Sequence, residues 1–506
     1  MPFLRQPKSI MNSHVDPLPC RRPKRRRRSR LLNASRLTLT FAFMLLGTSR
    51  AGIPPARLNI LFLFSDDQRF DTIAALGNRH IQTPHLDRLT REGLTFTRAY
   101  IMGGTQGAVC MPSRAMLMSG RTLFRVKDNL AGQTTWPERF SEAGYATFMT
   151  GKWHNGAESL LRSFAAGRAI FLGGMGDPYK LPLKDISPDR QLVHPRLSGE
   201  HSVKLFGDAA VEFLRRQKGD RPFLCYVAFN CPHDPRVAPT NYQARYTSSP
   251  PPLPTNFLPE HPFNNGEMTV RDEQLAPWPR TPAIVRQNLA DYYANIAFLD
   301  DQIGRILDAL QTSGQYERTI IVFSSDNGLA IGSHGLFGKQ NVYEHATHEP
   351  LIFAGPGIPR GQRSDAFCYL LDIFPTLGEL AGVAAPEGSE GRSLAPVIAG
   401  RSDHLRDTIF TAYRGLQRAI RDDRWKLIVY TQINKTQLFD LAANPDERTD
   451  LAADPQYASQ VQWLTAALQT QQKELGDRQP LTTDHPQPLA FDFSKVKRVN
   501  TPTPIE

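Results

Sequence analysis

The chain has 506 residues, of which 40% are hydrophobic and 22% charged, a composition typical of a globular protein with room for two or three domains. Its formal net charge is +11, but residues 1–51 hold 12 of the 60 Lys and Arg and 1 of the 49 Asp and Glu, which leaves 48 bases and 48 acids. The body of the protein is therefore formally neutral, which gives no support for nucleic-acid binding, and we expect none.

The first 51 residues have the pattern of a basic leader and signal peptide. A basic segment, 21–30, precedes an apolar run, 37–46, and small residues surround a cleavage site near Ala51. Because the run is too short to span a bilayer, we predict export to the periplasm or the extracellular space without a stable membrane anchor. The alternatives are a nuclear or nucleic-acid tag and an uncleaved anchor, and paired arginines leave twin-arginine export open.

Apolar runs alternate with helical patterns between residues 57 and 400. Runs typical of strands buried on both faces lie at 58–64, 145–150, 222–229, 319–324 and 350–354. Helical patterns lie at 84–93, 136–143, 202–217, 281–313 and 369–381. The alternation predicts an α/β domain with a central, mostly parallel sheet, in which ligands bind beyond the carboxyl ends of the strands.

Three further segments differ from this pattern. The Pro-rich segment 248–280 is a long irregular insertion, which we interpret as a lid or wall beside the active-site mouth. From 401 to 475, four short β-like segments with tight turns and a polar helix predict a smaller antiparallel α+β subdomain. Residues 476–506 form a polar, Pro-rich tail that we expect to be partly disordered.

The most specific motif begins at Cys110. The run Cys110–Arg114 (CMPSR) is followed by Leu117 and by Ser119–Arg121 (SGR). Pro112 suits the first turn of a helix, so the cysteine is predicted at the positive end of a helix, where an anion is favoured. A buried or incidental cysteine at a helix start is the simpler alternative, but it does not explain so many specified positions.

Polar residues follow two of the predicted strands. Asp66 and Asp67 end the first, and Asp326 and Asn327 end the fourth. Adjacent carboxylates at a strand end repel each other unless a cation or base lies between them, and all-oxygen donors suit Ca²⁺ or Mg²⁺. Either pair alone is typical of a turn or helix cap. Together, at one sheet edge, they predict a metal site.

Lys152, His154, His233 and Lys339 also lie at or just beyond predicted strand ends. Taken alone, the residue His233 would fit a structural role, and Lys339 would be a solvated surface lysine. The place of His233 at the same edge of the sheet favours a catalytic role for this histidine instead.

Residues 110–121 resemble the signature of the type I, formylglycine-dependent sulfatases, which begins C-x-P-S-R and ends (T/S)-G-R, and residues 144–154 are similar to the family's second signature, with Thr150 as a mild departure. The resemblance covers most of 57–400 in the expected order. It implies an alkaline-phosphatase-like α/β fold with a smaller antiparallel subdomain. It also implies Ca²⁺, with Mg²⁺ as the alternative, and oxidation of Cys110 to formylglycine by a maturation enzyme.

The resemblance assigns a role to each of these residues. The implied metal ligands are Asp66, Asp67, Asp326 and Asn327, and the implied catalytic residues are Cys110, Arg114, Lys152, His154, His233 and Lys339. A formylglycine hydroxyl would attack sulfur, with Asp326 accepting its proton, and His233 with Lys339 would protonate the leaving alkoxide. His154 would then take the proton of the second hydroxyl and expel sulfate.

Two other functions remain open. A formylglycine phosphonate or phosphodiester hydrolase tends to carry Gln and His at two metal positions, where this chain has Asp67 and Asn327. A catalytically silent carbohydrate-binding pseudoenzyme would keep Cys110 as a thiol, but the complete catalytic set argues against it.

The substrate is predicted only by class. Export fits a sulfated saccharide or a small sulfate ester such as choline sulfate, and we favour the saccharide by analogy. Arg236, His334 and the 248–280 insertion are expected to shape the substrate subsites, with Arg236 pairing with a sugar carboxylate.

Overall fold

The computed structural model describes residues 57–219 and 221–496. The predicted leader and its cleavage site lie outside these residues. The strands of the central sheet are β1 (Asn59–Asp66), β2 (Gly93–Tyr100), β4 (Ala146–Lys152), β5 (Ala166–Phe171), β6 (Pro182–Ile186), β7 (Leu192–Leu197), β8 (Phe223–Pro232), β9 (Thr319–Ser325), β10 (His348–Ala354), β11 (Gln362–Ser364) and β12 (Cys368–Tyr369).

These strands form one mixed sheet in the order β11-β2-β10-β9-β1-β8-β4-β5-β6-β7, with β12 also paired to β2. The five predicted apolar runs are all confirmed as strands, and they are the five central neighbours β10, β9, β1, β8 and β4. Four of these run parallel, whereas β10 is antiparallel to β9. Strands β2, β5, β6 and β7 were not predicted, because they carry polar or exposed residues and lack a continuous apolar run.

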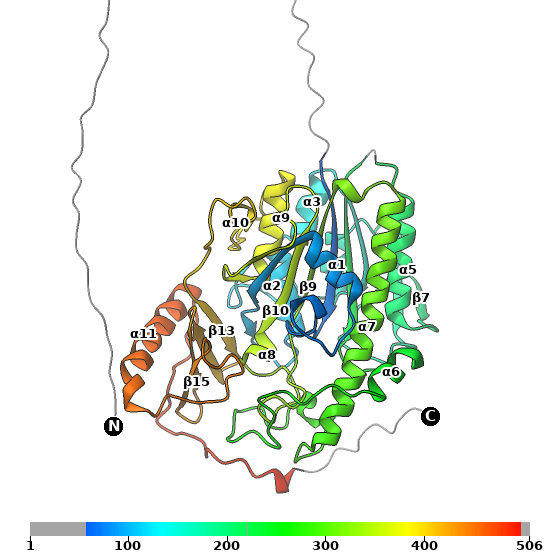
Figure 1. Ribbon diagram of the computed structural model, residues 1–506. Helices are drawn as coiled ribbons and strands as arrows, with labels where there is room; N and C mark the ends of the chain where they lie inside the picture. Colours follow the sequence, from blue (N-terminus) through cyan, green and yellow to red (C-terminus); the bar gives the residue numbers. More distant parts are fainter. Residues whose placement is uncertain (1–56, 220, 497–506) are drawn as a thin grey trace, which may run out of the picture. The chain divides into compact units, whose positions relative to one another are not determined.

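Helices cover both faces of the sheet (Figure 1). The α-helices of this domain are α1 (Pro84–Glu92), α2 (Cys110–Ser119), α3 (Trp136–Glu142), α4 (Ala157–Ser163), α5 (Ser202–Arg215), α6 (Thr240–Thr247), α7 (Pro282–Thr312), α8 (Glu344–Thr347), α9 (Ile373–Ala381) and α10 (Ala395–Ile398). Alternate residues of β1 point to opposite faces: Phe62 packs in the core with α2, α3 and α9, and Leu63 in the core with α1, α5 and α7. The sheet is therefore buried on both sides, as its apolar central strands require.

A second sheet follows the first in sequence and has the order β16-β15-β14-β13-β3. Its strands are β3 (Gly103–Gly104), β13 (Ile409–Tyr413), β14 (Gln417–Arg421), β15 (Trp425–Tyr430) and β16 (Lys435–Asp440), with α11 (Ala458–Leu475) packed against it. The predicted antiparallel C-terminal sheet is thus present. Its edge strand β3, however, comes from the loop before Cys110 and runs parallel to β13.

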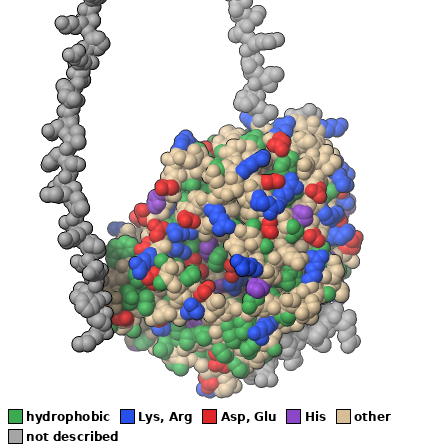
Figure 2. Space-filling view, in the orientation of Figure 1, with side chains coloured by type: hydrophobic (Ala, Val, Ile, Leu, Met, Phe, Trp, Pro, Cys, Tyr) green, Lys and Arg blue, Asp and Glu red, His purple; other side chains and the backbone are tan. Residues whose placement is uncertain are grey.

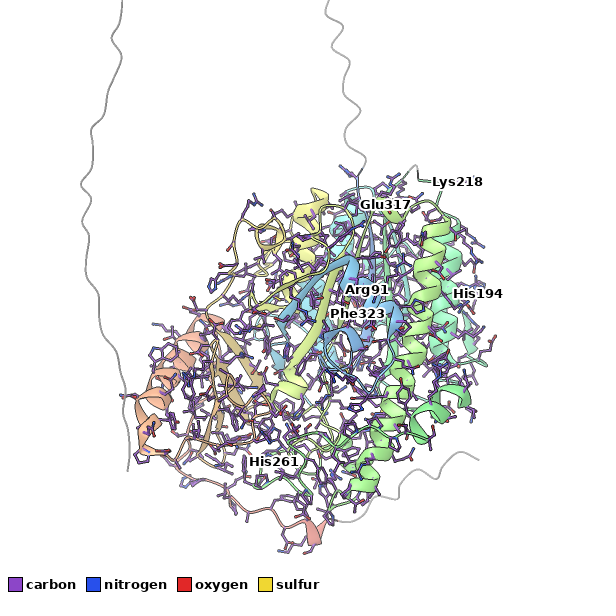
Figure 3. The ribbon with its side chains drawn as sticks, viewed as in Figure 1. Arg91, His194, Lys218, His261, Glu317 and Phe323 are labelled. Carbon is purple, nitrogen blue, oxygen red and sulfur yellow. The ribbon has the colours of Figure 1, made fainter. Side chains whose placement is uncertain are left out.

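The Pro-rich insertion lies beyond the carboxyl end of β9. Figure 3 shows His261 of the insertion at that end of the sheet, with Glu317, just before β9, at the other. The tail, expected to be partly disordered, packs on the insertion over its described part: the Asn264 N–H donates to the Leu489 carbonyl (2.8 Å), and the Trp278 and Phe493 rings lie 5.4 Å apart. The last helical turn, η6 (Phe493–Lys495), belongs to this segment.

Basic and acidic side chains are interspersed on the face of the molecule in Figure 2, in line with the neutral body. Of the helices within residues 57–496, none is both long enough and apolar enough to cross a membrane.

A buried charge network joins the two sheets at Glu344, the first residue of α8. Its carboxylate accepts hydrogen bonds from Tyr100 (2.7 Å), Arg421 (2.9 Å) and Lys426 (2.9 Å). Lys426 also pairs with Glu447 (2.8 Å), whose carboxylate accepts the backbone N–H of Glu344 (2.8 Å). Because these charges are buried, each depends on its partners for compensation.

We expect Glu344→Gln to lower the free energy of unfolding by about 3–5 kcal/mol, because a neutral amide removes the carboxylate that pairs with Arg421 and leaves Lys426 with Glu447 alone. Urea denaturation measures this change. The matched control is Glu92→Gln, which breaks a more exposed pair with Arg88 (3.0 Å) and is expected to cost about 0–1 kcal/mol. Equal losses in the two variants would contradict the prediction.

Candidate active site

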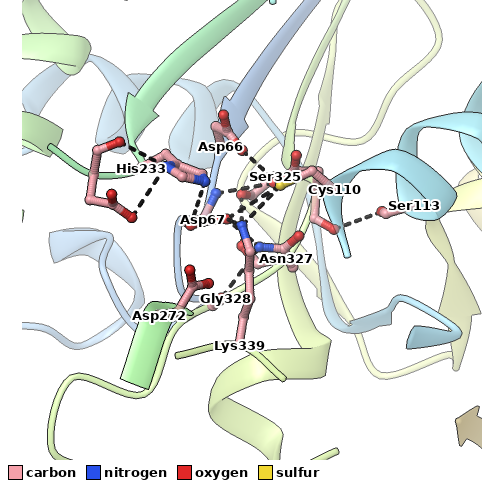
Figure 4. A network of polar contacts seen from close by, with 12 residues as sticks. Asp66, Asp67, Cys110, Ser113, His233, Asp272, Ser325, Asn327, Gly328 and Lys339 are labelled. Carbon is pink, nitrogen blue, oxygen red and sulfur yellow. Dashed lines mark hydrogen bonds and ion pairs between the residues drawn. The ribbon is translucent and has the colours of Figure 1, made fainter. Parts of the chain in front are cut away.

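The site is built where β1 and β9 end side by side. These strands pair in parallel up to Ser65 and Ser325, so the polar residues that follow them are neighbours (Figure 4). The Asp67 N–H donates to Asp326 Oδ1 (3.1 Å), and the Asn327 side-chain amide donates to Asp67 Oδ1. Asp67 adopts a left-handed backbone conformation (φ 66°), a strained geometry that turns the chain at this strand end.

Cys110 is the first residue of α2, as predicted. Its Sγ lies 3.4 Å from Asp66 Oδ1 and 3.9 Å from Asp67 Oδ1. One turn on, Ser113 Oγ donates to the Asp326 backbone carbonyl (2.7 Å), which ties the helix start to the end of β9. The structure therefore brings the cysteine motif and the carboxylates into one cluster.

Three buried cations neutralise the carboxylates. Lys152 Nζ lies 2.5 Å from Asp66 Oδ2, and Arg114 Nε lies 2.8 Å from Asp326 Oδ2. Lys339 Nζ lies 2.5 Å from Asp67 Oδ1 and 2.9 Å from Cys110 Sγ. The same cations can bind an anionic group that approaches Cys110.

The two predicted histidines lie beside this cluster. His233 Nε2 is 3.7 Å from Asp67 Oδ2, and its Nδ1 bonds to the Asp234 carbonyl oxygen (2.9 Å). His154 has a left-handed backbone (φ 66°) and a buried Nδ1 without a hydrogen-bond partner. Burial, together with the charges of Lys152 and Arg114, lowers the pKa of His154 to about 2, so its ring is neutral.

The clustered charges shift the pKa values of Asp66 and Asp326 in opposite directions. Burial alone would raise the pKa of Asp66, but Lys152, His233 and Arg114 hold it well below its usual range. Burial and the charge of Asp66 raise the pKa of Asp326 to about 6. Burial and Asp326 raise the pKa of the Cys110 thiol well above its ordinary value, which disfavours the free thiolate as a nucleophile.

The donor set fits a hard divalent cation. Donor atoms of Asp66, Asp67, Cys110 and His233 lie within 4.8 Å of one another. The buried Asn327 Oδ1 has no hydrogen-bond partner, which is the state expected of an oxygen that binds a cation. Because Ca²⁺ and Mg²⁺ prefer oxygen to sulfur, we favour the predicted set of Asp66, Asp67, Asp326 and Asn327 over one that includes the thiol.

A second group, His85, Asp300 and Asp301, also has donor atoms close together. Asp300 accepts the N–H groups of His85 (3.0 Å) and Leu86 (2.7 Å) at the start of α1, and Asp301 accepts a hydrogen bond from Tyr242. In this second group, the Asp300 carboxylate therefore already caps α1, and the Asp301 carboxylate already bonds to Tyr242.

The two predicted substrate residues differ in their surroundings. Arg236 is partly buried and donates to Asn288 (3.2 Å), but its Nε and Nη2 have no partner. His334 is 6% exposed, stacks on Tyr343 at 4.0 Å and bonds to Asn256 of the insertion (3.1 Å). Arg236 thus has two buried donors without a partner, whereas His334 is bonded to the insertion.

Sequence analysis did not predict the contribution of Asp272 and Gln340. Gln340 donates to Asp272 (2.7 Å) and to the Gly107 carbonyl (3.0 Å), which links the insertion to the loop before Cys110. Gln340 directly follows Lys339 in the sequence, and this position could have indicated that it lies near the site. Asp272 lies in an irregular segment where no strand end indicates its position.

The comparisons with known proteins agree with this geometry. A family model described as Sulfatase matches residues 58–383, and one described as N-sulphoglucosamine sulphohydrolase, C-terminal, matches residues 332–474. The chain belongs to the sulfatase family. It is thus a hydrolase that acts on sulfuric ester bonds.

Its relatives include enzymes with named substrates. It is 27% identical to an N-acetylglucosamine-6-O-sulfatase of Bacteroides thetaiotaomicron, over 84% of this chain and 88% of the relative, and 30% identical to a choline-sulfatase of Rhizobium meliloti, over 76% and 80%. A structure solved with its substrate D-glucosamine-2-N,6-O-disulfate has a TM-score of 0.72 at 25% identity, covering 84% of this chain and 99% of the other. A phosphonate monoester hydrolase of Agrobacterium radiobacter, at 23% identity and a TM-score of 0.68 over 83% and 96%, shares the fold.

We expect Asn327→Ala to weaken Ca²⁺ binding at least about 10–100-fold, the loss typical when even an outer-shell partner of a metal site is removed, and His233→Ala to leave it unchanged. Isothermal titration calorimetry on the purified protein gives both affinities. Asp301→Asn, in the second group, is the control and should bind Ca²⁺ like the wild type. A loss confined to His233→Ala would instead assign the cation to the Asp66, Asp67, Cys110 and His233 set.

Proposed function

We propose that this sulfatase removes sulfate from a sulfated saccharide outside the cytoplasm, in the periplasm or the extracellular space, with Cys110 converted to formylglycine and a divalent cation, Ca²⁺ or Mg²⁺, held by Asp66, Asp67, Asp326 and Asn327. The observation that carries the proposal is the contact of Cys110 with both the carboxylates and Lys339. When present, the aldehyde hydrate supplies the nucleophile and the cation supplies charge for the sulfate oxygens.

The protein's own side chains supply the remaining chemistry. Lys152, Lys339 and Arg114 place positive charge around Cys110, where they would orient a sulfate group and stabilise its developing charge. His233 lies on the Asp67 side of the cluster, where it can donate a proton to a leaving oxygen. The neutral His154 can accept a proton on the Lys152 side.

Two lines support a saccharide as substrate. A relative named N-acetylglucosamine-6-O-sulfatase and a structure solved with a disulfated glucosamine align over most of this chain. Arg236 has spare donors that suit a sugar carboxylate. The choline-sulfatase relative supports the alternative, a small sulfate ester. The family assignment argues against the phosphonate hydrolase and the silent pseudoenzyme.

The nucleophile can be tested by mass spectrometry of the tryptic peptide Ala99–Arg114 from protein produced with a formylglycine-generating enzyme. We expect the cysteine sulfur to be replaced by an aldehyde oxygen, and Cys110→Ala to lower kcat by at least about 10³-fold, the order found when a nucleophile is removed. An intact thiol in protein that nevertheless hydrolyses sulfate esters would contradict the proposal. Faster hydrolysis of phosphonate esters than of sulfate esters would favour the alternative enzyme.

Arg236→Ala is expected to lower kcat/KM about 10-fold on a uronate-containing sulfated oligosaccharide and to leave the rate on a neutral sulfated sugar unchanged. The reason is the loss of a charge-assisted hydrogen bond, which is worth about 1.5–3 kcal/mol. Steady-state kinetics on both substrates test this, with Arg236→Lys as the variant that keeps the charge. Unchanged rates on both would exclude Arg236 from the substrate subsite.

A further inference from the structure

The C-terminal end of the Pro-rich insertion is hydrogen-bonded to the loop that carries Lys339. Both carboxylate oxygens of Glu273 accept the Phe337 N–H (2.9 Å each), and Oε1 also accepts the Gly338 N–H (2.8 Å). The neighbouring Asp272 accepts the Gln340 side-chain amide (2.7 Å). Two adjacent carboxylates of η2 (Arg271–Leu275) thus hold the loop on both sides of Lys339.

The contact is close enough to require a glycine. A Cβ at Gly338 would lie 2.3 Å from Gln340 Oε1 and 2.8 Å from the Asp272 Cβ. The same Gln340 oxygen accepts the Lys339 N–H (3.1 Å), so the lysine backbone is fixed as well. The loop therefore has little freedom to shift without breaking several buried hydrogen bonds.

Arg280 compensates the buried negative charge of Glu273. Its side chain is fully buried and donates to the Glu273 carboxylate (2.8 Å) and backbone carbonyl (2.7 Å). Its guanidinium also lies over the rings of Trp278 (4.2 Å) and Phe337 (5.0 Å). A buried carboxylate without this partner would carry an uncompensated charge, so Glu273 can hold the loop only as part of the pair.

The side-chain ammonium of Lys339 contacts Cys110 and Asp67. Lys339 Nζ lies 2.9 Å from Cys110 Sγ and 2.5 Å from Asp67 Oδ1. A lysine side chain is flexible, so the position of its ammonium depends on where the backbone is held. A misplacement of 1 Å at such a position can cost about 10² in rate.

We propose that Glu273 and Arg280 are positioning residues that fix Lys339 against residue 110 and so control how well the leaving oxygen is stabilised. The inference rests on the proposed function, in which Lys339 acts with His233 on the leaving group. The insertion thereby acquires a definite role, because it sets the geometry of a catalytic lysine from about 60 residues earlier in the sequence.

The test uses Glu273→Gln and Arg280→Lys in the full, matured protein, with two aryl sulfates of unequal leaving groups. Poor leaving groups need more stabilisation, so we expect kcat/KM on phenyl sulfate to fall about 10²-fold, and that on 4-nitrophenyl sulfate to fall less than about 5-fold. Hydrogen–deuterium exchange reports the loop directly: the amides of Phe337 and Gly338 should exchange faster in both variants. Exchange as slow as in the wild type at these amides, or equal losses on the two esters, would overturn the proposal.

Asp372→Asn is the matched control. Asp372 also accepts two backbone N–H groups, from Tyr369 (2.7 Å) and Arg392 (2.7 Å), and pairs with an arginine, Arg406 (2.6 Å), but it holds the start of α9. The Asp372→Asn variant should have a lower Tm, but the amides of Phe337 and Gly338 should exchange at the wild-type rate. Its kcat/KM should change by the same factor on both esters. The proposed function fails only if the wild type also leaves sulfated saccharides intact, and the exchange data decide independently whether Glu273 and Arg280 hold the loop.

Discussion

The structure depends on the burial of three carboxylates at one sheet edge. Asp66, Asp67 and Asp326 are each at most 1% exposed and lie within reach of one another. Like charges in such a place repel strongly, and the protein compensates them with Lys152, Arg114 and Lys339, themselves buried. These three cations come from three different segments, so the fold must bring distant parts of the chain together before the charges balance.

Lys152 ends β4 of the central sheet, but the other two segments are held in place from outside that sheet. The loop before Cys110 forms β3, which pairs with β13 of the C-terminal sheet, and a Cβ at Gly103 would lie 2.0 Å from the Ala412 carbonyl oxygen. The loop of Lys339 is held by the insertion through Glu273 and Asp272. The central sheet therefore supplies the carboxylates, while the second sheet and the insertion position two of the groups that face them.

Local sequence patterns predicted the centre of this arrangement well. The continuous apolar runs are the five central strands, because a strand buried on both faces must be apolar throughout. The residues at their carboxyl ends could then be placed together, since parallel strands end at one edge. The outer strands β5–β7 and the pairing of β3 with β13 escaped prediction, because a half-exposed strand has a weak pattern and two glycines carry no sign of a partner about 300 residues away. His334 was predicted to shape a substrate subsite, but it stacks on Tyr343 and bonds to Asn256 of the insertion, whose path no periodicity encodes.

The close ion pairs also bear on how a divalent cation would bind. Lys339 and the Asn327 amide both point at Asp67 Oδ1, so a cation that coordinates this oxygen must displace at least one of them. Rotation of the Asn327 amide would turn its unpartnered Oδ1 toward the cluster at little cost. Lys339 also faces Cys110 Sγ (2.9 Å). Since its backbone is fixed by Glu273 and Gln340, the ammonium would stay beside residue 110, where an incoming sulfate ester needs positive charge.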